Sequence, residues 1–466
     1  MPKMRTTLIR GGAAVIGQTV SQQDVLIQGE HIAALGKLSD HKADIEIDAS
    51  GLLVLPGAVD THVHFNDMFM NTISVHDYYT GTLAAAYGGV TSLIDFSNQV
   101  SGEPLMNTLK IKKDEAKGKA LVDWGVHPVI TQPTPNILEE IPLVVEEGAP
   151  SVKCYLTYRE EGLMVKEEDL KRILESLQKS GGMLMVHAED NEIIEENVKR
   201  FISSGLSKPI YHAQSRPPEA ENRAIRRCLQ LAKETGGRVF IVHLASDEGV
   251  ELIGAAKLEG LDVIAETCTH YLILTEKMLE RDDGIKWICS PPLRSQSIQD
   301  KLWEGLEDGR LAMVTSDDAA YSWEAKLYGA QRFDECPNGI PGIEARLNLL
   351  YSEGVAKGRI ALPRFVELVS TTPANVFGLA PQKGSLNSGS DADIVLFDPK
   401  AKWNMNQQTL HMATDWSAYE NIEITGKILK VFSRGDLIID GDRCLAEKGR
   451  GRYIRRQLDL SRQKPT

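Results

Sequence analysis

Residues 56–65 read PGAVDTHVHF and give the first indication of the fold. A short apolar run, suited to a buried parallel strand, ends in two histidines at alternate positions, His62 and His64. Alternate residues of a strand point to the same side, so both imidazoles are expected to face one side of the strand's carboxyl end. Such a pair alone is weak evidence for a metal site, because many histidines are simply hydrogen-bonded. The rest of the chain supplies the context.

Seven further short apolar runs follow, and helical patterns separate several of them. The eight expected strands are 58–64, 91–96, 122–126, 151–155, 184–186, 239–242, 263–267 and 313–316. Amphipathic stripes mark helices between them, one formed by Leu170, Ile173, Leu174 and Leu177 and another by Ile225, Cys228, Leu229 and Ala232. Eight strand–helix units over roughly 320 residues predict a (β/α)₈ TIM-like barrel of the α/β class. The alternative is an open doubly wound sheet, but no GxGxxG or GxxxxGK[ST] follows any of these runs.

The two ends of the chain differ from the middle. Short strands are expected at 6–10, 24–27 and 31–35, and again at 392–397 and 428–432. This arrangement predicts one small β-sandwich domain built from both termini, residues 1–55 and 376–466, around a barrel at 56–375. The basic and polar segment after Gly449 is expected to be an arm or a frayed tail.

Composition limits the kinds of partner. The 466 residues carry a formal net charge of −13, which argues against a general binder of nucleic acid or of anionic membranes. Six cysteines without a CxxC pair indicate buried free thiols in a reducing compartment. The sequence contains no apolar run of about 18 residues, so a membrane span is not expected and a cytoplasmic location is.

Six side chains of metal-binding type stand at or near the ends of the expected strands. They are His62, His64, Lys153, His187, His243 and Asp317. In a parallel barrel all carboxyl ends open on one face, where active sites form. Only eleven histidines exist in the chain, and four of them fall at such ends. Five others are expected to be structural or solvent-exposed: His31, His41, His127, His212 and His411.

Lys153 is the unusual member of this group. A lysine in a strand usually pairs or extends its amine to solvent. Beside two divalent cations, however, an ammonium group would be strongly repelled, and burial also favours the neutral amine. A neutral amine adds carbon dioxide to become a carbamate, an anion with two oxygens suited to bridging two metals. With the carbamate, Asp317 and a bridging hydroxide, the formal charge of the site falls from about +4 to about +1.

Several segments of the chain carry motifs that match one known family. Besides 56–65, they are SVKCYLTY at 151–158, VHAE at 186–189, IVHLAS at 241–246, SPPLR at 290–294, PNGIPGIE at 337–344, GSDAD at 389–393 and DWSAYE at 415–420. These segments resemble the hydantoinase/dihydropyrimidinase family of cyclic amidases, within the amidohydrolase superfamily. The similarity runs from about residue 6 to residue 440.

The resemblance implies a role for each metal-type residue. His62 and His64 bind the more buried metal, and His187 and His243 bind the more exposed one. Lys153, as N6-carboxylysine, bridges the two ions. Zinc is favoured because imidazole nitrogen and carboxylate oxygen suit it, while manganese and cobalt remain alternatives.

The resemblance also assigns the reaction. Asp317 ligates the buried metal and shuttles a proton, Tyr158 donates a hydrogen bond to the oxyanion, and Ser290 and Asn338 hold the substrate. A metal-bridging hydroxide opens hydantoins or dihydropyrimidines to N-carbamoyl amino acids. A homotetramer or homodimer is implied, with a small cyclic amide as substrate and with no nucleic acid or membrane partner.

Two other functions stay open. One is a different cyclic amidase or imidase, acting on cyclic imides, allantoin or dihydroorotate. The other is a non-catalytic scaffold on the same fold, which is less favoured because all six metal-type residues are present.

One position departs from the family pattern. The family usually has a histidine directly after the strand-eight aspartate, whereas this chain has Asp318 after Asp317. A second carboxylate at this point is expected to raise the pKa of Asp317 and to alter substrate preference.

Overall fold

Eight parallel strands form the central sheet, and each pairs with the next along the chain. They are β6 (Ala58–Val63), β9 (Val90–Asn98), β10 (Asp123–Val129), β11 (Ser151–Tyr155), β12 (Met183–His187), β13 (Val239–Ile241), β14 (Val263–Cys268) and β15 (Met313–Thr315). This computed structural model describes residues 5–459. The strand order never reverses, as it does in a doubly wound sheet, so the predicted barrel is confirmed.

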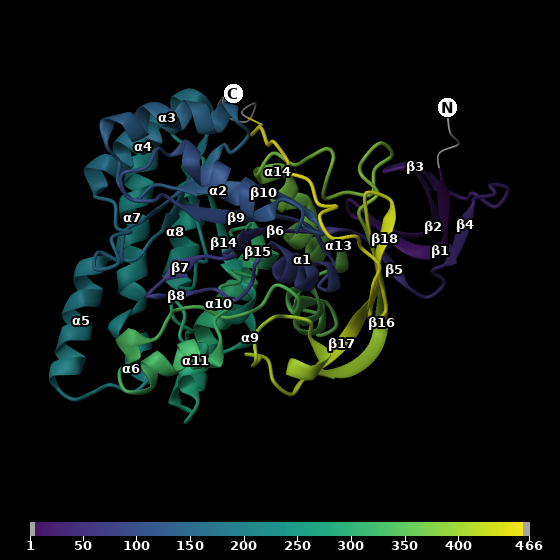
Figure 1. Ribbon diagram of the computed structural model, residues 1–466. Coiled ribbons are helices and arrows are strands. Elements are labelled where there is room, and N and C mark those ends of the chain that lie inside the picture. The colour runs from purple at the N-terminus through teal and green to yellow at the C-terminus, as the bar shows by residue number, and fades with distance from the viewer. Residues whose placement is uncertain (1–4, 460–466) are drawn as a thin grey trace.

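Helices between the strands cover the barrel (Figure 1). The longer ones are α1 (Tyr78–Tyr87), α2 (Met106–Ala116), α3 (Pro135–Glu146), α4 (Glu167–Ser180), α5 (Asn191–Ser203), α7 (Pro218–Thr235), α8 (Asp247–Leu258) and α10 (Gln296–Glu307). The short ones are α6 (Ile210–Ser215), α9 (Thr269–Ile273), α11 (Trp323–Lys326), α12 (Arg346–Leu350), α13 (Leu362–Val366) and α14 (Thr372–Val376). The predicted stripe on α4 is buried in full, because these side chains pack on the strands.

A buried ion pair closes the barrel between its first and last strands. Arg346 donates to the carbonyl oxygen of Val59 on β6 at 3.2 Å and to that of Val314 on β15 at 2.8 Å. Its Nε lies 3.3 Å from the Asp60 carboxylate, which also accepts from the backbone N–H of Ser316. Side chains therefore join the strand of the two-histidine motif to the strand before the predicted catalytic aspartate.

Strands from both chain ends form one mixed sheet beside the barrel (Figure 1). They are β1 (Thr6–Ile16), β2 (Thr19–Gln28), β3 (His31–Gly36), β4 (Ile45–Asp48), β5 (Leu53–Pro56), β16 (Ile394–Met405), β17 (Ile422–Ser433), β18 (Asp436–Asp440) and β19 (Arg443–Cys444). Antiparallel pairing of β5 with β16 joins the two ends, which confirms that both termini build one β unit. A separate hairpin, β7 (Met68–Phe69) with β8 (Thr72–Ile73), follows the two-histidine motif.

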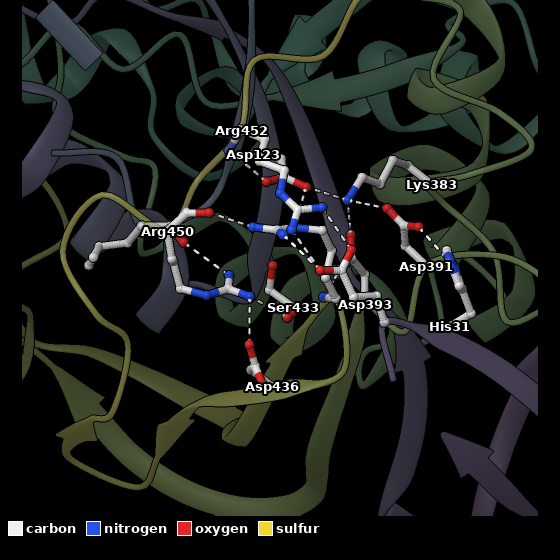
Figure 2. A network of polar contacts seen from close by, with 12 residues as sticks. His31, Asp123, Lys383, Asp391, Asp393, Ser433, Asp436, Arg450 and Arg452 are labelled. Atoms are coloured by element: carbon white, nitrogen blue, oxygen red, sulfur yellow. Dashed lines mark hydrogen bonds and ion pairs between the residues drawn. The ribbon is translucent and has the colours of Figure 1, made fainter. Parts of the chain in front are cut away.

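A network of charged side chains ties the barrel to this sheet (Figure 2). Lys383 lies within 3.0 Å of three carboxylates, those of Asp123 on β10, Asp391 and Asp393. Arg434, which follows β17, also contacts Asp123, at 3.1 Å. Four of these five groups are buried, and Asp391 is partly exposed. Because all of them are paired, the network fixes how the sheet sits on the barrel.

The segment after Gly449 lies along β10. The N–H of Trp124 donates to the carbonyl of Arg452, and the N–H of Ile454 donates to the carbonyl of Trp124. Arg456 is buried, and its guanidinium donates to Ser151 on β11 and to the carbonyl of Val126. This arm therefore pairs with the barrel over residues 450–456. Within residues 5–459, no helix is both long enough and apolar enough to cross a membrane.

Candidate active site

The predicted site residues converge at the carboxyl ends of the barrel strands. Eight of them line one cavity of about 60 Å³: His64, Lys153, Tyr158, His187, His243, Ser290, Asp317 and Asn338. His62 is fully buried and lies against them. Tyr158 and Asn338 also line a neighbouring cavity of about 590 Å³, so the small cavity has a larger space beside it.

Donor atoms of metal-binding type approach one another at this point. Nε2 of His62 lies 3.0 Å from Asp317 Oδ1 and 3.3 Å from Lys153 Nζ. Nε2 of His64 lies 3.5 Å from the same Asp317 oxygen. One ligand atom each from His62, His243 and Asp317 lie within 4.8 Å of one another, close enough to share an ion. Imidazole and carboxylate donors in this number suit zinc and similar divalent metals.

Three carboxylates that the sequence analysis did not select orient the histidines. Glu266 on β14 contacts Nδ1 of His62 at 2.5 Å, and Asp67 contacts Nδ1 of His64 at 3.0 Å. Glu189 contacts Nε2 of His187 at 2.7 Å. A carboxylate behind a metal-binding histidine fixes its ring and tautomer. The signal for Glu266 was present, since it is an acidic residue within the apolar run 263–267.

Burial shapes the charge of the two remaining histidines and of the lysine. It lowers the pKa of His187 and, further, that of His243, so both imidazoles are neutral, as metal ligation requires. Burial also lowers the pKa of Lys153 to about 8, although the charges of Asp317 and Glu266 act in the opposite direction. At pH 7 about one-tenth of such an amine is neutral, far more than of a lysine with its ordinary pKa.

Three of the site residues have backbone angles that L-residues rarely adopt. The φ angle is +65° at Tyr158, +39° at His243 and +47° at Asp317. Such conformations cost on the order of 1–3 kcal/mol each and persist only where the surrounding structure enforces them. They turn these side chains into the barrel mouth just after the strands end.

A second group of contacts involves the predicted substrate-binding residues of the same cavity. Asn338 Nδ2 donates to the Tyr158 hydroxyl at 3.2 Å. His212 Nε2 lies 2.8 Å from the Cys289 carbonyl and 3.3 Å from the Ser290 hydroxyl. The prediction that His212 is structural therefore understates its position, because it supports a predicted substrate-binding residue. His127 is buried and hydrogen-bonded to Ser151 and Thr61, as a structural histidine should be.

Asp318 does not act on Asp317 as the sequence predicted. Burial raises the pKa of Asp317, but His62, His64 and His243 outweigh this and hold it well below its usual range. The Asp318 carboxylate points elsewhere: it contacts His76 Nδ1 at 2.8 Å and accepts the N–H groups of Gly342 and Ile343. The predicted rise in the pKa of Asp317 is therefore wrong, because the Asp318 carboxylate interacts with His76, Gly342 and Ile343 instead.

We expect the variant Asp318→Asn to lower stability by about 1–3 kcal/mol. His76 accepts the N–H of Ala413 at Nε2, so its Nδ1 carries the proton that Asp318 receives. In Asp318→Asn, the amide oxygen would still accept the N–H groups of Gly342 and Ile343. Its N–H₂ group would then face the N–H of His76, so two donors would meet and this hydrogen bond would be lost. Denaturant midpoints of wild type, Asp318→Asn and the exposed control Asp308→Asn measure the effect. Equal midpoints for wild type and Asp318→Asn would show that the buried contact contributes nothing.

Imidazoles, a lysine and a carboxylate gather at the mouth of a parallel barrel, the place where active sites of this fold form. The Amidohydrolase family model matches residues 53–438. D-hydantoinase of Geobacillus stearothermophilus is 38% identical over 455 residues, 97% of this chain and 96% of that protein. D-phenylhydantoinase of Escherichia coli O1:K1 / APEC is 40% identical over 454 residues, 97% of this chain and 98% of that protein.

The fold comparison agrees with the sequence comparisons. The crystal structure of dihydropyrimidinase from Brevibacillus agri NCHU1002 superimposes with a TM-score of 0.96 at 37% identity, covering 99% of this chain and 100% of that chain. The chain therefore belongs to the amidohydrolase family.

Proposed function

We propose that this protein hydrolyses the cyclic amide bond of hydantoins or dihydropyrimidines and releases N-carbamoyl amino acids. The observation that carries the proposal is the convergence of the predicted ligands and predicted substrate-binding groups on one small cavity. Relatives that match nearly the whole chain carry the names D-hydantoinase, D-phenylhydantoinase and dihydropyrimidinase, which supports the same substrate class.

The donor set fits two divalent metal ions. By the family resemblance, His62, His64 and Asp317 would hold one ion, His187 and His243 the other, and Lys153, carboxylated by carbon dioxide, would bridge them. The close approach of ligand atoms from His62, His243 and Asp317 supports a metal centre at this place. Nδ1 of His243 is buried and has no hydrogen-bond partner among residues 5–459, as an unused ligand atom would be. When bound, such ions polarise an amide carbonyl and make hydroxide available at neutral pH. Zinc suits these donors best, with manganese or cobalt as alternatives.

The chain's own residues account for the remaining steps. Water adds to the amide carbon, the ring C–N bond breaks, and the leaving nitrogen takes a proton, which yields a carboxylate and a ureido group. Asp317 accepts the proton from water and returns it to that nitrogen. Tyr158 donates to the oxygen that becomes negative, while Ser290 and Asn338 hold the ring. Burial raises the pKa of Tyr158 to about 12, so the hydroxyl stays protonated and can donate a hydrogen bond.

We expect Tyr158→Phe to lower kcat by about 10²- to 10³-fold while the metal content is unchanged. The hydroxyl acts only where charge develops, so its removal affects the transition state more than the bound substrate. Steady-state kinetics on the best cyclic amide provide the measurement. Tyr155→Phe is the matched control, since Tyr155 lines the same cavity. Unchanged kinetics in Tyr158→Phe would remove this residue from the mechanism.

A substrate panel tests the proposed function. Hydantoin, dihydrouracil, 5-aryl hydantoins, succinimide, allantoin and dihydroorotate are compared by relative turnover, with product identified by mass. We expect the highest turnover on a hydantoin or dihydrouracil. Preference for succinimide, allantoin or dihydroorotate would favour the other cyclic amidases. A folded, metal-loaded protein inactive on every compound would support the scaffold alternative.

Two expectations stay predictions alongside this function. One is the division into a barrel at 56–375 and a terminal β domain at 1–55 and 376–466. The other is assembly as a homotetramer or homodimer, which light scattering on the purified protein measures directly.

A further inference from the structure

Lys326, the last residue of α11, is fully buried near the candidate site. Its ammonium donates to the carbonyl oxygen of Ile288 at 2.9 Å and to that of Pro337 at 2.8 Å. The Trp416 ring centre lies 5.9 Å from Nζ. Lys326 thus joins two segments that are about fifty residues apart in the sequence.

Burying an ammonium group that contacts only uncharged carbonyls costs free energy, so the position of Lys326 requires an explanation. Removing a cation from water costs several kcal/mol unless charges of opposite sign surround it. Two other buried lysines follow that rule: Lys383 contacts three carboxylates, and Lys112 contacts those of Asp95 and Glu115. Burial lowers the pKa of Lys326, and its two acceptors carry only partial charge, so these contacts contribute little stability for the desolvation they cost.

The two carbonyls belong to the segments that present the predicted substrate-binding residues. Ile288 lies two residues before Ser290, and Pro337 directly precedes Asn338. The N–H of Gly339 also donates to the Ile288 carbonyl, at 3.0 Å. Lys326 and this backbone bond therefore fix the separation of the two segments.

Close packing on the other side leaves these segments little room. A Cβ at Gly339 would lie 2.4 Å from the carbonyl oxygen of Ala319. The carbonyl of Cys289 lies 2.8 Å from His212 Nε2. With these neighbours fixed, Lys326 and the hydrogen bond from Gly339 to Ile288 hold Ser290 and Asn338 at their separation.

We propose that Lys326 is a positioning residue that sets the spacing of Ser290 and Asn338 for recognition of the cyclic amide. This inference rests on the proposed function. Ser290 and Asn338 are the predicted substrate-binding residues, and Asn338 also donates to the Tyr158 hydroxyl at 3.2 Å. A change in their spacing therefore raises KM, because substrate binding is weakened, and lowers kcat to a smaller extent through Tyr158.

The test uses Lys326→Met, which keeps the length of the side chain and removes its donors. With hydantoin or dihydrouracil as substrate, we expect KM to rise about 10-fold or more, kcat to change less than about 3-fold, and metal content to match wild type. We expect the KM of Lys326→Gln to lie between those of wild type and Lys326→Met, because the neutral amide of glutamine still donates to a carbonyl.

Lys257→Met is the matched control. Lys257 also donates to two backbone carbonyls, those of Gly309 and Arg310, but these precede β15 at the end of the barrel away from the cavity. We expect Lys257→Met to lower the denaturant midpoint and to leave KM unchanged. A purely structural role for Lys326 predicts the same behaviour for both lysine variants.

The outcomes separate the inference from the proposed function. Wild type without turnover on any cyclic amide would overturn both. An active wild type with an unchanged KM in folded Lys326→Met would overturn the inference alone. If Lys326→Met does not fold, Lys326→Gln decides, since it must show a raised KM with normal metal content. Amide hydrogen exchange must also quicken at 288–290 and 338–339 and not at 62–67; unchanged exchange at the first two segments would contradict the proposal.

Discussion

Replacement of Lys153 by alanine is expected to reduce cyclic-amide hydrolysis by at least about 10³-fold, a loss of about 4 kcal/mol in transition-state stabilisation. The Lys153 amine lies 3.3 Å from Nε2 of His62 in a fully buried position, where a carboxylated lysine would offer two anionic oxygens to the two proposed ions. Alanine removes that bridge. Turnover and metal content of the variant are measured together, because both are expected to fall.

Short carboxylic acids are expected to restore part of the lost activity. Acetate or propionate added to Lys153→Ala can enter the vacated space and supply two oxygens, and wild type assayed with the same acids controls for effects of salt. Lys383→Ala is not a suitable control variant, because the loss of Lys383 would disturb the charged network that holds the barrel to the terminal sheet. Full activity of Lys153→Ala without added acid would refute the bridging role.

Arg346→Met is expected to give the largest loss of stability, about 3–5 kcal/mol. Arg346 is fully buried, and it joins the carbonyls of Val59 and Val314 while facing the Asp60 carboxylate. Methionine fills similar space but leaves a buried carboxylate without its cation. Chemical unfolding of the wild type and the variant provides the measurement.

Arg364→Met is the matched control for this experiment. Arg364 also bridges two carbonyls, those of Leu306 and Leu311, and pairs with Glu367, but it is partly exposed. We expect a loss of about 1 kcal/mol or less there, because water replaces the lost partners. A loss at Arg346 no larger than at Arg364 would mean that the first and last strands are held by other contacts.

The sequence predicted the barrel because its strands are buried on both faces. Each such strand is a short run of apolar residues, and all eight predicted runs coincide with observed strands. The stripe on α4 was equally visible, since a helix that packs on a sheet needs apolar residues every three or four positions. The position of the candidate site followed from parallel topology, which places every carboxyl end on one face.

Contacts between distant polar residues could not be predicted in the same way. Asp60 and Arg346 are in contact, but in the sequence they lie near opposite ends of the barrel, and no local pattern links one to the other. The same holds for His76 with Asp318 and for Lys326 with Ile288. Hydrophobic periodicity records which face of an element is buried, but not which buried charge meets which partner.

The metal content of the purified protein tests the central claim most directly. Elemental analysis after expression with zinc and bicarbonate is expected to give about two divalent ions per folded chain. Less than one ion per chain in a correctly folded preparation would contradict the proposed binuclear centre and the hydrolysis that depends on it.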